Sequence, residues 1–523
     1  MSDSENQTIT ARSALHAQRR PDVPALVIEG RTITYRELHL ESNRSANALL
    51  ATGLERQARV AYLGKETEHY YELTIACAKA GVVMVPVNWR LIKAEVEHIL
   101  RDSQAEVLFV ERDFLSIVER LRSELPALRT IIEMDSATER AVGFDAWKAG
   151  HPDTDPGVDA DPEDPIAQMY TSGTTGLPKG AVLAHRSYFT FIEHTRRAGV
   201  DAIDWRPEDR SLTCFPGLHA GGYAWFMHCF NVGATNVVLR MFIPDEAVRV
   251  IRDEGVTTVW AAPAMLKMML DEKIATPDAF RSLRKIVYGG SPIDYELMVR
   301  CLEEFGCELV QAYAAAETGS FVTCLTAAEH VPGSPLMASA GRVLPGNEVK
   351  IIDGEGNELP PNQTGRICLK SPARFKGYWH RPEATAEMVV GEWLHMGDAG
   401  YLDENGYLFL QDRINDTIIV AGQNIYPIEV ENALRAHPAV ADVAVFGVKD
   451  PRWGEVVRAA VVLRADAEPV RDRDLMVFLR GRIADYKIPG GYRFLDDLPR
   501  NPTGKVLRRV LRDQYADPVA GRR

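Results

Sequence analysis

Short apolar stretches alternate with longer amphipathic ones over the first part of the chain. Mostly apolar runs typical of buried strands occur at 25–29, 60–63, 82–86 and 105–110. Between them, apolar residues recur at helical spacing over 35–52, 71–80 and 94–103. Strands that alternate with helices favour a largely parallel sheet covered by helices on both faces. The pattern therefore predicts an α/β fold.

The same alternation resumes after a connection at 150–164 that is rich in Asp, Pro and Gly. A strand is expected at 166–170, and α/β texture then continues over 188–313, with strands at 256–260 and 285–288. From 341 to 410 the pattern changes to short β-like runs between turn residues, which predicts a β-rich subdomain. Helical spacing near 427–437 and 472–484 indicates a separate α+β unit.

These changes in pattern divide the chain of 523 residues into parts. Residues 1–20 are expected to be a loose N-terminal segment, and residues 21–412 a large N-terminal domain of stacked α/β sheets plus the β-rich subdomain. A polar, charged run at 411–416 separates two apolar strands and indicates a linker. Residues 417–523 then form a small α+β C-terminal domain.

Composition narrows the function classes. Hydrophobic residues make up 46% and charged residues 25%, as in ordinary globular proteins. A formal net charge of −13 argues against a general nucleic-acid or anionic-membrane binder. Seven cysteines without any C-x-x-C pair disfavour a zinc site or a disulfide framework. With no apolar signal core and no apolar run of about 18–20 residues, we expect a cytoplasmic protein without integral membrane contact.

The strongest chemical signal runs from Tyr170 to Gly180, Tyr-Thr-Ser-Gly-Thr-Thr-Gly-Leu-Pro-Lys-Gly. Glycines let backbone N–H groups approach phosphate oxygens, hydroxyls add donors, and the lysine adds a positive charge. It is not a Walker A loop, which needs Gly-Lys-Ser/Thr in succession. A flexible surface loop is the alternative. The candidate phosphate-binding residues are Thr171, Ser172, Gly173, Thr174, Thr175, Gly176 and Lys179.

Further segments follow this loop in a fixed order. They are Gln311-Ala-Tyr-Ala-Ala-Ala-Glu317, Trp393-Leu-His-Met-Gly-Asp398, Asp412-Arg-Ile-Asn-Asp416, Gly422-Gln-Asn-Ile-Tyr-Pro-Ile-Glu-Val-Glu431 and Asn501-Pro-Thr-Gly-Lys505. In this order and spacing the chain resembles the adenylate-forming superfamily, which includes acyl-CoA synthetases, peptide-synthetase adenylation domains and beetle luciferases. The resemblance spans about residues 25–512.

The resemblance implies a reaction in two halves. A carboxylate attacks the α-phosphorus of ATP to give an acyl-adenylate and pyrophosphate, and a thiol, usually that of CoA, then displaces AMP. Mg²⁺ is the implied cofactor, with ATP and CoA as co-substrates. Because an anionic acid must meet an anionic triphosphate, counter-charge and positioning dominate such catalysis.

The resemblance also assigns roles to residues that bind the nucleotide. Glu317 is implied as the Mg²⁺ ligand, since carboxylate oxygen suits a hard cation; a solvated carboxylate at a helix start is the alternative. Tyr313 is expected to lie on the adenine, and Asp398 to accept both ribose hydroxyls. The remaining residues of this ATP/AMP set are Gly289, Gly290, Ser291, Gln311, Ala312 and Arg413.

Lys505 is implied as the lysine that bridges the attacking carboxylate and the α-phosphate, although a lone lysine in a terminal turn is by default solvated. The family's small C-terminal domain is mobile and rotates between the half-reactions. The hinge corresponds to 413–416, with Asn415 as the hinge residue. After rotation, Gly422, Gln423 and Asn424 are expected to line the CoA tunnel.

Two apolar segments resemble the acyl pocket of the family. His219 is implied as a gate that moves when the carboxylate binds; a buried structural histidine is the alternative. No acidic residue occurs between 215 and 226, and a buried ammonium without a counter-charge would be costly, so free amino acids are disfavoured. A fatty, branched, alicyclic or aryl acid is expected. The pocket residues are His219, Gly222, Tyr223, Trp260, Ala261 and Ala314.

The chain departs from the family pattern at four positions. Alanines replace a glycine at Ala314 and a threonine at Ala316, Met396 replaces a threonine, and Asn415 replaces the usual Asp or Lys. An active acyl-CoA synthetase is still expected. The alternatives are a stand-alone ligase that loads a carrier protein, a luciferase-like oxygenase, or a degenerate relative that binds nucleotide without turnover. Whether the protein is a homodimer is left open.

Overall fold

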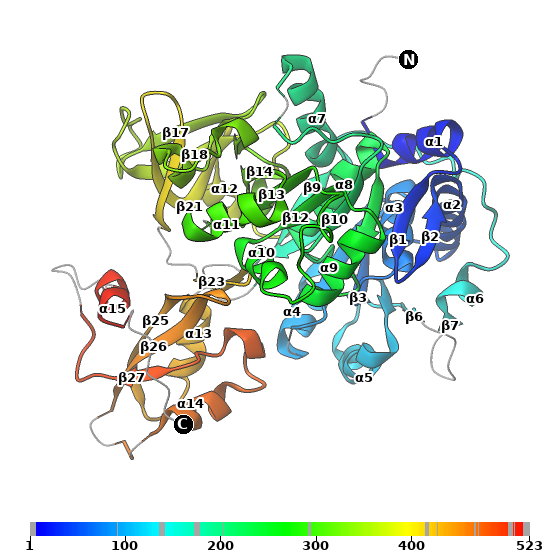
Figure 1. Ribbon diagram of the computed structural model, residues 1–523. Coiled ribbons are helices and arrows are strands. Elements are labelled where there is room, and N and C mark those ends of the chain that lie inside the picture. Colours follow the sequence, from blue (N-terminus) through cyan, green and yellow to red (C-terminus); the bar gives the residue numbers. More distant parts are fainter. Residues whose placement is uncertain are drawn as a thin grey trace. The chain divides into compact units, whose positions relative to one another are not determined.

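The computed structural model divides into two compact units (Figure 1). Unit 1 comprises Met1–Trp89, Ile99–Thr171 and Lys179–Gln411, and unit 2 comprises Arg90–His98, Ser172–Pro178 and Asp412–Arg523. The described residues are 7–91, 93–134, 142–171, 178–200, 202–290, 293, 295–413, 418–425, 427–464, 467–468, 470–499, 506 and 508–515.

The largest sheet of unit 1 has nine strands. Its neighbours β1, β11, β10, β12, β13 and β14 run parallel, and the strands at both edges pair antiparallel. In spatial order the strands are β16 (Arg342–Val343), β15 (Thr323–Leu325), β14 (Glu308–Tyr313), β13 (Lys285–Gly289), β12 (Thr258–Ala261), β10 (Arg210–Thr213), β11 (Thr235–Val238), β1 (Pro24–Ile28) and β2 (Arg31–Thr34).

A second sheet of unit 1 has eight strands. Its strands from β8 to β7 run parallel, whereas β9 pairs antiparallel with both β8 and β19. In spatial order the strands are β19 (Gly377–Tyr378), β9 (Lys179–Ala184), β8 (Pro165–Thr171), β4 (Val83–Asn88), β3 (Arg59–Gly64), β5 (Val107–Val110), β6 (Thr130–Glu133) and β7 (Val142–Gly143).

The β-rich stretch forms a third, five-stranded sheet, as its turn-rich pattern predicted. Its strands are β17 (Glu348–Ile352), β18 (Gly365–Lys370), β21 (Trp393–Leu402), β20 (Val389–Val390) and β22 (Leu408–Arg413).

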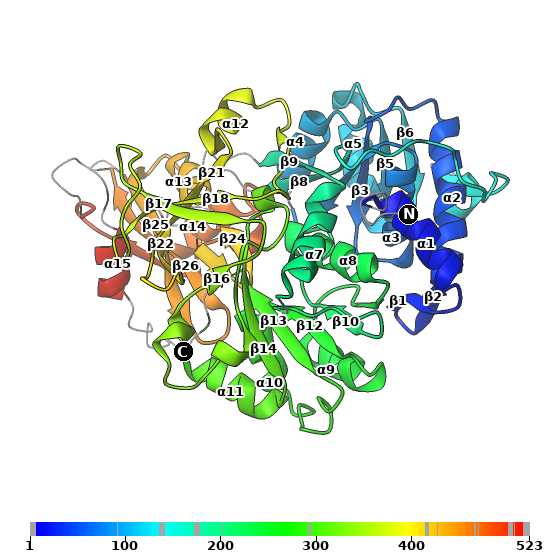
Figure 2. The same ribbon diagram turned by 90° about the horizontal axis from the view of Figure 1, so that it is seen from above.

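Helices connect the parallel strands. Two of them, α7 and α8, contact each other; α7 packs on β9 and α8 on β10 and β11, so the pair lies between the two large sheets (Figure 2). The helices up to residue 388 are α1 (Ile9–Arg19), α2 (Tyr35–Ala51), α3 (Glu68–Lys79), α4 (Lys93–Ser103), α5 (Arg112–Leu121), α6 (Phe144–Lys148), α7 (Arg186–Ala198), α8 (Ala220–Val232), α9 (Pro244–Asp253), α10 (Pro263–Leu270), α11 (Tyr295–Phe305) and α12 (Pro382–Met388).

The N-terminal segment corrects one expectation. Residues 1–20 were expected to be loose, but helix α1 occupies Ile9–Arg19 and begins at its N-cap Thr8, whose hydroxyl accepts a hydrogen bond from the Ala11 N–H. The helix buries Ile9, Ser13 and His16, and because its sequence is mostly polar, the hydrophobic pattern did not indicate this packing. No described helix has the length and apolar content needed to cross a membrane.

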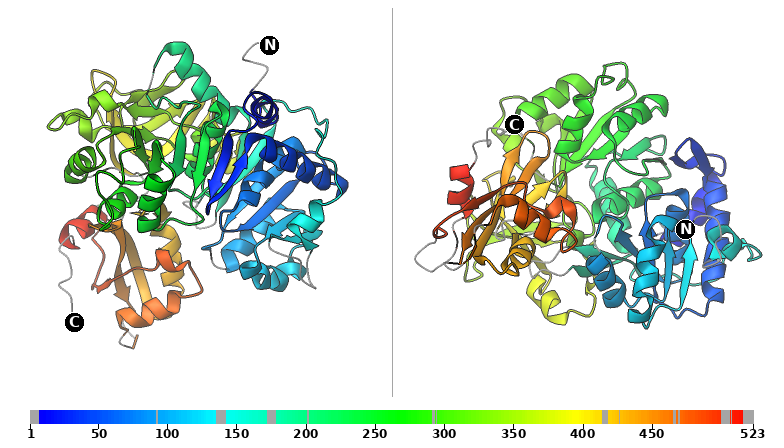
Figure 3. Two further views of the ribbon diagram at one scale, coloured as in Figure 1. Left: turned by 45° about the vertical axis from the view of Figure 1, so that its right-hand side comes forward. Right: turned by 90° about the horizontal axis from the view of Figure 1, so that it is seen from below.

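Unit 2 contains a five-stranded sheet with helices on both faces. Successive residues of β25 point to opposite faces: Val443 and Val445 join the core on the side of α13 and α14, and Ala444 and Phe446 join the core with α15. Figure 3 shows the red helix α15 across the orange strands from α13. The elements are β23 (Ile418–Val420), β24 (Gln423–Ile425), α13 (Pro427–Arg435), β25 (Val440–Asp450), β26 (Gly454–Leu463), α14 (Asp472–Leu479), β27 (Tyr492–Phe494) and α15 (Arg508–Tyr515).

A buried charged pair joins three helices of unit 1 and generates a prediction. Lys148 Nζ of α6 lies 2.8 Å from Glu72 Oε1 of α3, which also accepts a 2.5 Å hydrogen bond from Ser45 Oγ of α2. Lys148→Met should lower the free energy of unfolding by about 3–5 kcal/mol, because it leaves a carboxylate buried without its partner. Urea denaturation measures the loss. The double variant with Glu72→Gln should recover much of it, and an equal loss in both variants would contradict this account.

Candidate active site

Four neighbouring parallel strands bring distant parts of the sequence to one edge of the nine-stranded sheet (Figure 1). Trp260 lies at the end of β12, Gly289 ends β13 and Tyr313 ends β14, while His219 follows shortly after β10. The carboxyl ends of parallel strands meet at the same edge, which is where open α/β sheets bind ligands. The sheet therefore gathers the predicted adenine and acyl residues in one place.

The predicted adenine and ribose residues contact each other. Tyr313 Oη donates a 2.7 Å hydrogen bond to Asp398 Oδ2, and Asp398 lies on β21 of the five-stranded sheet. The neighbouring Gln311 is buried, and its Oε1 lies 3.4 Å from Tyr288 Oη. The Gln311 side chain is thus directed toward the sheet core, whereas Tyr313 and Asp398 form a half-buried polar pair.

Gly289 allows β13 to approach its neighbours closely. A methyl group on Gly289 would lie 2.4 Å from the carbonyl oxygen of Ala312 and 2.7 Å from Trp260 Cη2. Gly290 follows with φ +79°, in the left-handed region that favours glycine. These two residues bring the turn after β13 against Phe215 and Trp260. Ser291 lies outside the described residues.

The two ends of the predicted phosphate loop are fixed by strand pairing. Thr171 ends β8 and pairs antiparallel with Lys179, which begins β9. The residues between them that were expected to bind phosphate, Ser172, Gly173, Thr174, Thr175 and Gly176, lie outside the described residues. The two strands therefore define where the loop leaves and re-enters the eight-stranded sheet.

Tyr378 joins Lys179 to Glu317, and the sequence did not single it out. The Lys179 ammonium lies 5.4 Å from the centroid of the Tyr378 ring, and Tyr378 Oη donates a 2.6 Å hydrogen bond to Glu317 Oε1. Tyr378 reaches this place because β19 pairs with β9, opposite Ala181. Its only sequence signal is an aromatic Tyr-Trp pair after a glycine, which says nothing about Glu317.

An aromatic wall contains two of the predicted acyl residues. The His219 and Phe215 rings stack with centroids 6.2 Å apart, Phe215 contacts Trp260 at 5.0 Å, and Trp260 stacks on Trp225 at 5.6 Å. Burial lowers the pKa of His219, so its imidazole is neutral near pH 7. His219 Nδ1 accepts a 3.3 Å hydrogen bond from the N–H of Gly221, so the ring carries its proton on Nε2.

The other predicted acyl residues are more scattered. Tyr223 packs its buried ring against Tyr188 at 5.4 Å, and Ala261 is fully buried. Gly222 lies against Pro216, and Ala314 is exposed. Among the described residues, Trp260 Nε1 and Tyr223 Oη are buried without a hydrogen-bond partner. His219 and Trp260 are therefore the members of this set that share one wall.

Some predicted residues belong to the last part of the chain. Gly422 lies in the turn of the β23–β24 hairpin and Gln423 begins β24; Ala421 and Gly422 both have positive φ, as a tight two-residue hairpin turn requires. The backbone places Asn424 in β24 and Arg413 at the end of β22. Asn415 and Lys505 lie outside the described residues.

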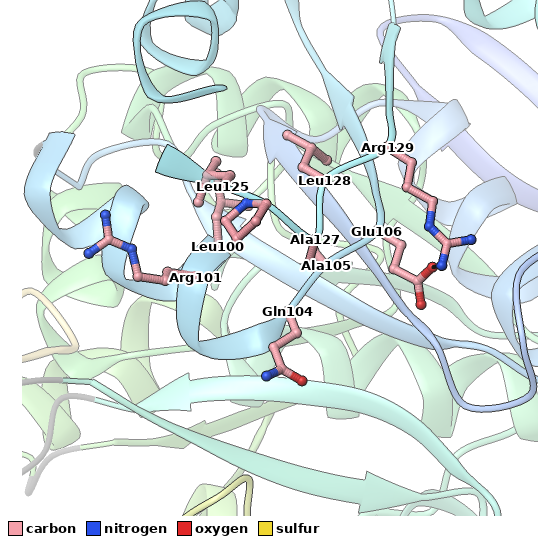
Figure 4. Close-up of a pocket in the computed structure, with 10 residues that line it drawn as sticks. Leu100, Arg101, Gln104, Ala105, Glu106, Leu125, Ala127, Leu128 and Arg129 are labelled. Atoms are coloured by element: carbon pink, nitrogen blue, oxygen red, sulfur yellow. Dashed lines mark ion pairs between the residues drawn. The ribbon is translucent and has the colours of Figure 1, made fainter. Parts of the chain in front are cut away.

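A cavity of about 460 Å³ lies elsewhere in unit 1 (Figure 4). Arg129 and Glu106, which line it, form an ion pair of 3.0 Å and precede β6 and β5. The cavity thus lies at the amino ends of the strands, away from the edge where ligands bind in such sheets. No cluster of three metal-ligating side chains occurs among the described residues of either unit.

Comparisons with known proteins cover nearly the whole chain. The family model described as AMP-binding enzyme matches residues 14–379, and the AMP-binding enzyme C-terminal domain matches residues 429–505. A fatty acid–[acyl-carrier-protein] ligase, ScoC of Streptomyces coeruleorubidus, is 51% identical over 97% of this chain and 96% of its own length. A feruloyl-CoA synthase of an Amycolatopsis species is 35% identical over 98% and 99%. The solved structure of the amide bond synthetase McbA from Marinactinospora thermotolerans is 29% identical with a TM-score of 0.87, over 98% of this chain and 100% of that one.

The close approach at Gly289 generates a prediction. Gly289→Ala should lower the free energy of unfolding by about 1–3 kcal/mol, because its methyl group must displace Trp260 or the end of β14. Chemical denaturation measures the change. Gly354→Ala is the control, since a methyl group there meets nothing within 4 Å, and its effect should stay within about 0.5 kcal/mol. Equal effects of the two substitutions would contradict the close packing.

Proposed function

Because this chain belongs to the AMP-binding enzyme family and is an AMP-forming acid–thiol ligase, we propose that it converts an apolar carboxylic acid into its CoA thioester through an acyl-adenylate. The resemblance to the adenylate-forming superfamily and the α/β fold class are confirmed by these matches and by the solved structures. We therefore propose the class of acid, the acceptor thiol and the roles of single residues.

The observation that best supports the proposal is that two groups of polar side chains meet at the end of β14 and in the segment that follows it. Tyr313 with Asp398 forms one set, and Glu317 with Tyr378 and Lys179 forms the other. Tyr313 and Glu317 are four residues apart on one segment, so the two sets lie next to each other along the chain. In the proposal Tyr313 and Asp398 hold the adenosine, and Lys179 faces the phosphates.

Glu317 suits a Mg²⁺ ion that is shared with ATP. Its carboxylate is mostly buried, accepts one hydrogen bond from Tyr378, and forms no ion pair with a basic side chain in the described part of the chain. Mg²⁺ is commonly held by one or two carboxylates plus substrate phosphates, so a single ligand of this kind fits. When bound, the ion neutralises charge on the phosphate oxygens as pyrophosphate departs.

The apolar aromatic wall supports an uncharged acyl group. The neutral His219 stacks on Phe215, which contacts Trp260 and through it Trp225, and no acidic side chain appears in this wall among the described residues. The acid enters as a carboxylate beside His219, and its tail packs against rings rather than against a counter-charge. In-line attack then depends on orientation, which rigid aromatic contacts provide.

A carrier protein is the second candidate acceptor. The relative that is 51% identical is named a fatty acid–[acyl-carrier-protein] ligase, whereas the feruloyl-CoA synthase is 35% identical. Both acceptors present a thiol that displaces AMP from the same acyl-adenylate. The first half-reaction is therefore common to both candidates, and only the second separates them.

A panel of carboxylic acids tests the proposal. For each acid, release of AMP and pyrophosphate is measured with ATP alone, with added CoA, and with an added phosphopantetheinylated carrier protein. The thioester products are identified by mass spectrometry. AMP release with CoA and a CoA thioester product support the main proposal. Thioester only on the carrier protein supports the second candidate. No AMP with any acid or acceptor would overturn both and favour a nucleotide-binding relative without turnover.

Lys505→Ala should separate the half-reactions. If Lys505 stabilises charge between the attacking carboxylate and the α-phosphate, its loss should slow adenylate formation by about 10²–10³. Thioester formation from a supplied acyl-adenylate should stay near the wild-type rate. Stopped-flow measurement of each half-reaction checks this, with Lys449→Ala as a matched lysine substitution of the same unit. An equal fall in both half-reactions would contradict the assignment.

Tyr378→Phe should affect the phosphate end. The variant keeps the ring under Lys179 but removes the 2.6 Å hydrogen bond to Glu317. Because hydrogen bonds to charged groups contribute about 1.5–3 kcal/mol, we expect adenylate formation to slow about 10- to 100-fold and the half-saturating Mg²⁺ concentration to rise. Titration of pyrophosphate release with Mg²⁺ measures both. Tyr401→Phe is the control, and equal Mg²⁺ curves for both variants would contradict the role of Tyr378.

A further inference from the structure

Glu66 is a buried carboxyl group that contacts the turn carrying His219. It lies between β3 and α3 and is 4% exposed. Tyr71 Oη donates a hydrogen bond to Glu66 Oε2. Among the described residues no basic side chain neutralises Glu66, so its surroundings are apolar rings and hydrogen-bond donors. A buried carboxyl without a cation is costly and therefore calls for an explanation.

The residue that Glu66 holds is Gly217. The Gly217 backbone N–H favours the charged form of the Glu66 carboxyl group and lowers its pKa, and the Gly217 carbonyl accepts a 2.7 Å hydrogen bond from Tyr70 Oη. A methyl group on Gly217 would lie 2.6 Å from Tyr71 Oη and 3.0 Å from Glu66 Oε2. Tyr70 thus fixes the Gly217 carbonyl, while Tyr71 and Glu66 approach Gly217 so closely that only glycine fits without a shift.

Hydrogen bonds and close packing within the turn fix the position of His219 relative to Gly217. The His219 N–H donates to the carbonyl of Pro216 at 2.9 Å, and Gly221 donates to His219 Nδ1 at 3.3 Å. A methyl group on Gly222 would lie 2.2 Å from the Pro216 carbonyl oxygen. A turn this short and tightly packed cannot shift at Gly217 without moving the imidazole two residues later.

We propose that Glu66 is a positioning residue that fixes the His219 turn through Gly217 and thereby sets the affinity of the enzyme for its carboxylic acid. This inference rests on the proposed function, because it takes the acid to bind beside His219. Glu66 itself does not touch the acid.

The charge on Glu66 gives the proposal a pH signature. Burial raises the pKa of Glu66 to about 7, and the hydrogen bonds from Tyr71 and Gly217 partly offset that rise. The ionisable groups that face it are Tyr62 of β3 and Tyr70 and Tyr71 of α3; beyond Tyr62, Glu111 is paired with Arg240 at 2.8 Å. Hydrogen bonds to a charged acceptor are the stronger ones, so the grip on Gly217 should tighten as pH rises through about 7.

Folding stability should change in the opposite direction. A carboxyl whose pKa is raised in the folded state adds stability that is complete below its unfolded pKa of 4.5 and is lost as pH rises through about 7. Acid binding should therefore improve over the same range in which stability declines. A purely structural role would make both worsen together.

The test compares Glu66→Gln with the wild type between about pH 5.5 and about pH 8.5, a range that brackets the transition. The KM for the acid and the KM for ATP are measured by pyrophosphate release. In the wild type the KM for the acid should fall about 5- to 10-fold as pH rises through about 7, and in the variant it should stay high without a step. The KM for ATP should be the same in both.

Two further variants sharpen the result. Tyr71→Phe removes a donor that favours the charged form, so the step should move to higher pH; this variant carries the test if Glu66→Gln fails to fold. Glu133→Gln is the matched control, because Glu133 is also buried but pairs with Arg112 at 2.6 Å, and it should keep the wild-type profile. Identical acid profiles for Glu66→Gln, Glu133→Gln and the wild type would overturn the proposal.

Backbone exchange provides a readout without turnover. Amide hydrogen exchange over 215–223, corrected for its intrinsic pH dependence, should slow above about pH 7 in the wild type and show no such step in Glu66→Gln. A step in exchange together with no activation of any acid would overturn the proposed function and leave the Glu66 grip standing. Acid activation without any step in exchange or in the KM for the acid would overturn the grip alone.

Discussion

The site depends on the parallel alignment of β10, β12, β13 and β14. Because these neighbouring strands end at one edge, the segments after them are forced together although almost a hundred residues separate the first from the last. Gly289 is the point at which this alignment is tightest, since no side chain fits between its Cα, the Ala312 carbonyl and Trp260. The position of Tyr313 follows from the same register, because β14 pairs with β13 from Lys285 to Gly289.

The eight-stranded sheet contributes to the site by a different route. Its β8–β9 pair fixes Thr171 opposite Lys179, and β19 adds Tyr378 at the edge of β9. Tyr378 then reaches Glu317, which belongs to the segment after β14 of the other sheet. The Tyr378 hydroxyl thus connects the edge of the eight-stranded sheet to the segment that follows Tyr313. With α7 and α8 packed between the sheets, a shift of one sheet against the other would break this contact.

Much of the architecture could be predicted from the sequence, because strand and helix periods are local signals. The parallel strands, the β-rich subdomain and the family followed from alternation and from motifs in order. Helix α1 was missed because its apolar face is short and its sequence mostly polar. Tyr378 and Glu66 were missed for another reason: their contacts with Glu317 and Gly217 join residues more than sixty positions apart, and no local pattern encodes such contacts. The predicted roles of Lys505 and Asn415 stay predictions.

Neutrality is the common feature of the proposed acyl side of this site. Burial keeps His219 uncharged, and it holds Glu66 near the balance between its two protonation states rather than paired with a cation. A permanent ion pair in this region would lock the turn and place a fixed charge beside the apolar acid, which would raise the cost of desolvation. A lone carboxyl group that accepts a hydrogen bond from Tyr71 and packs against Gly217 avoids both effects: in the proposal it orients the turn, and its burial lowers stability above neutral pH. The residues around the proposed acid site are therefore held in place without a permanent ion pair.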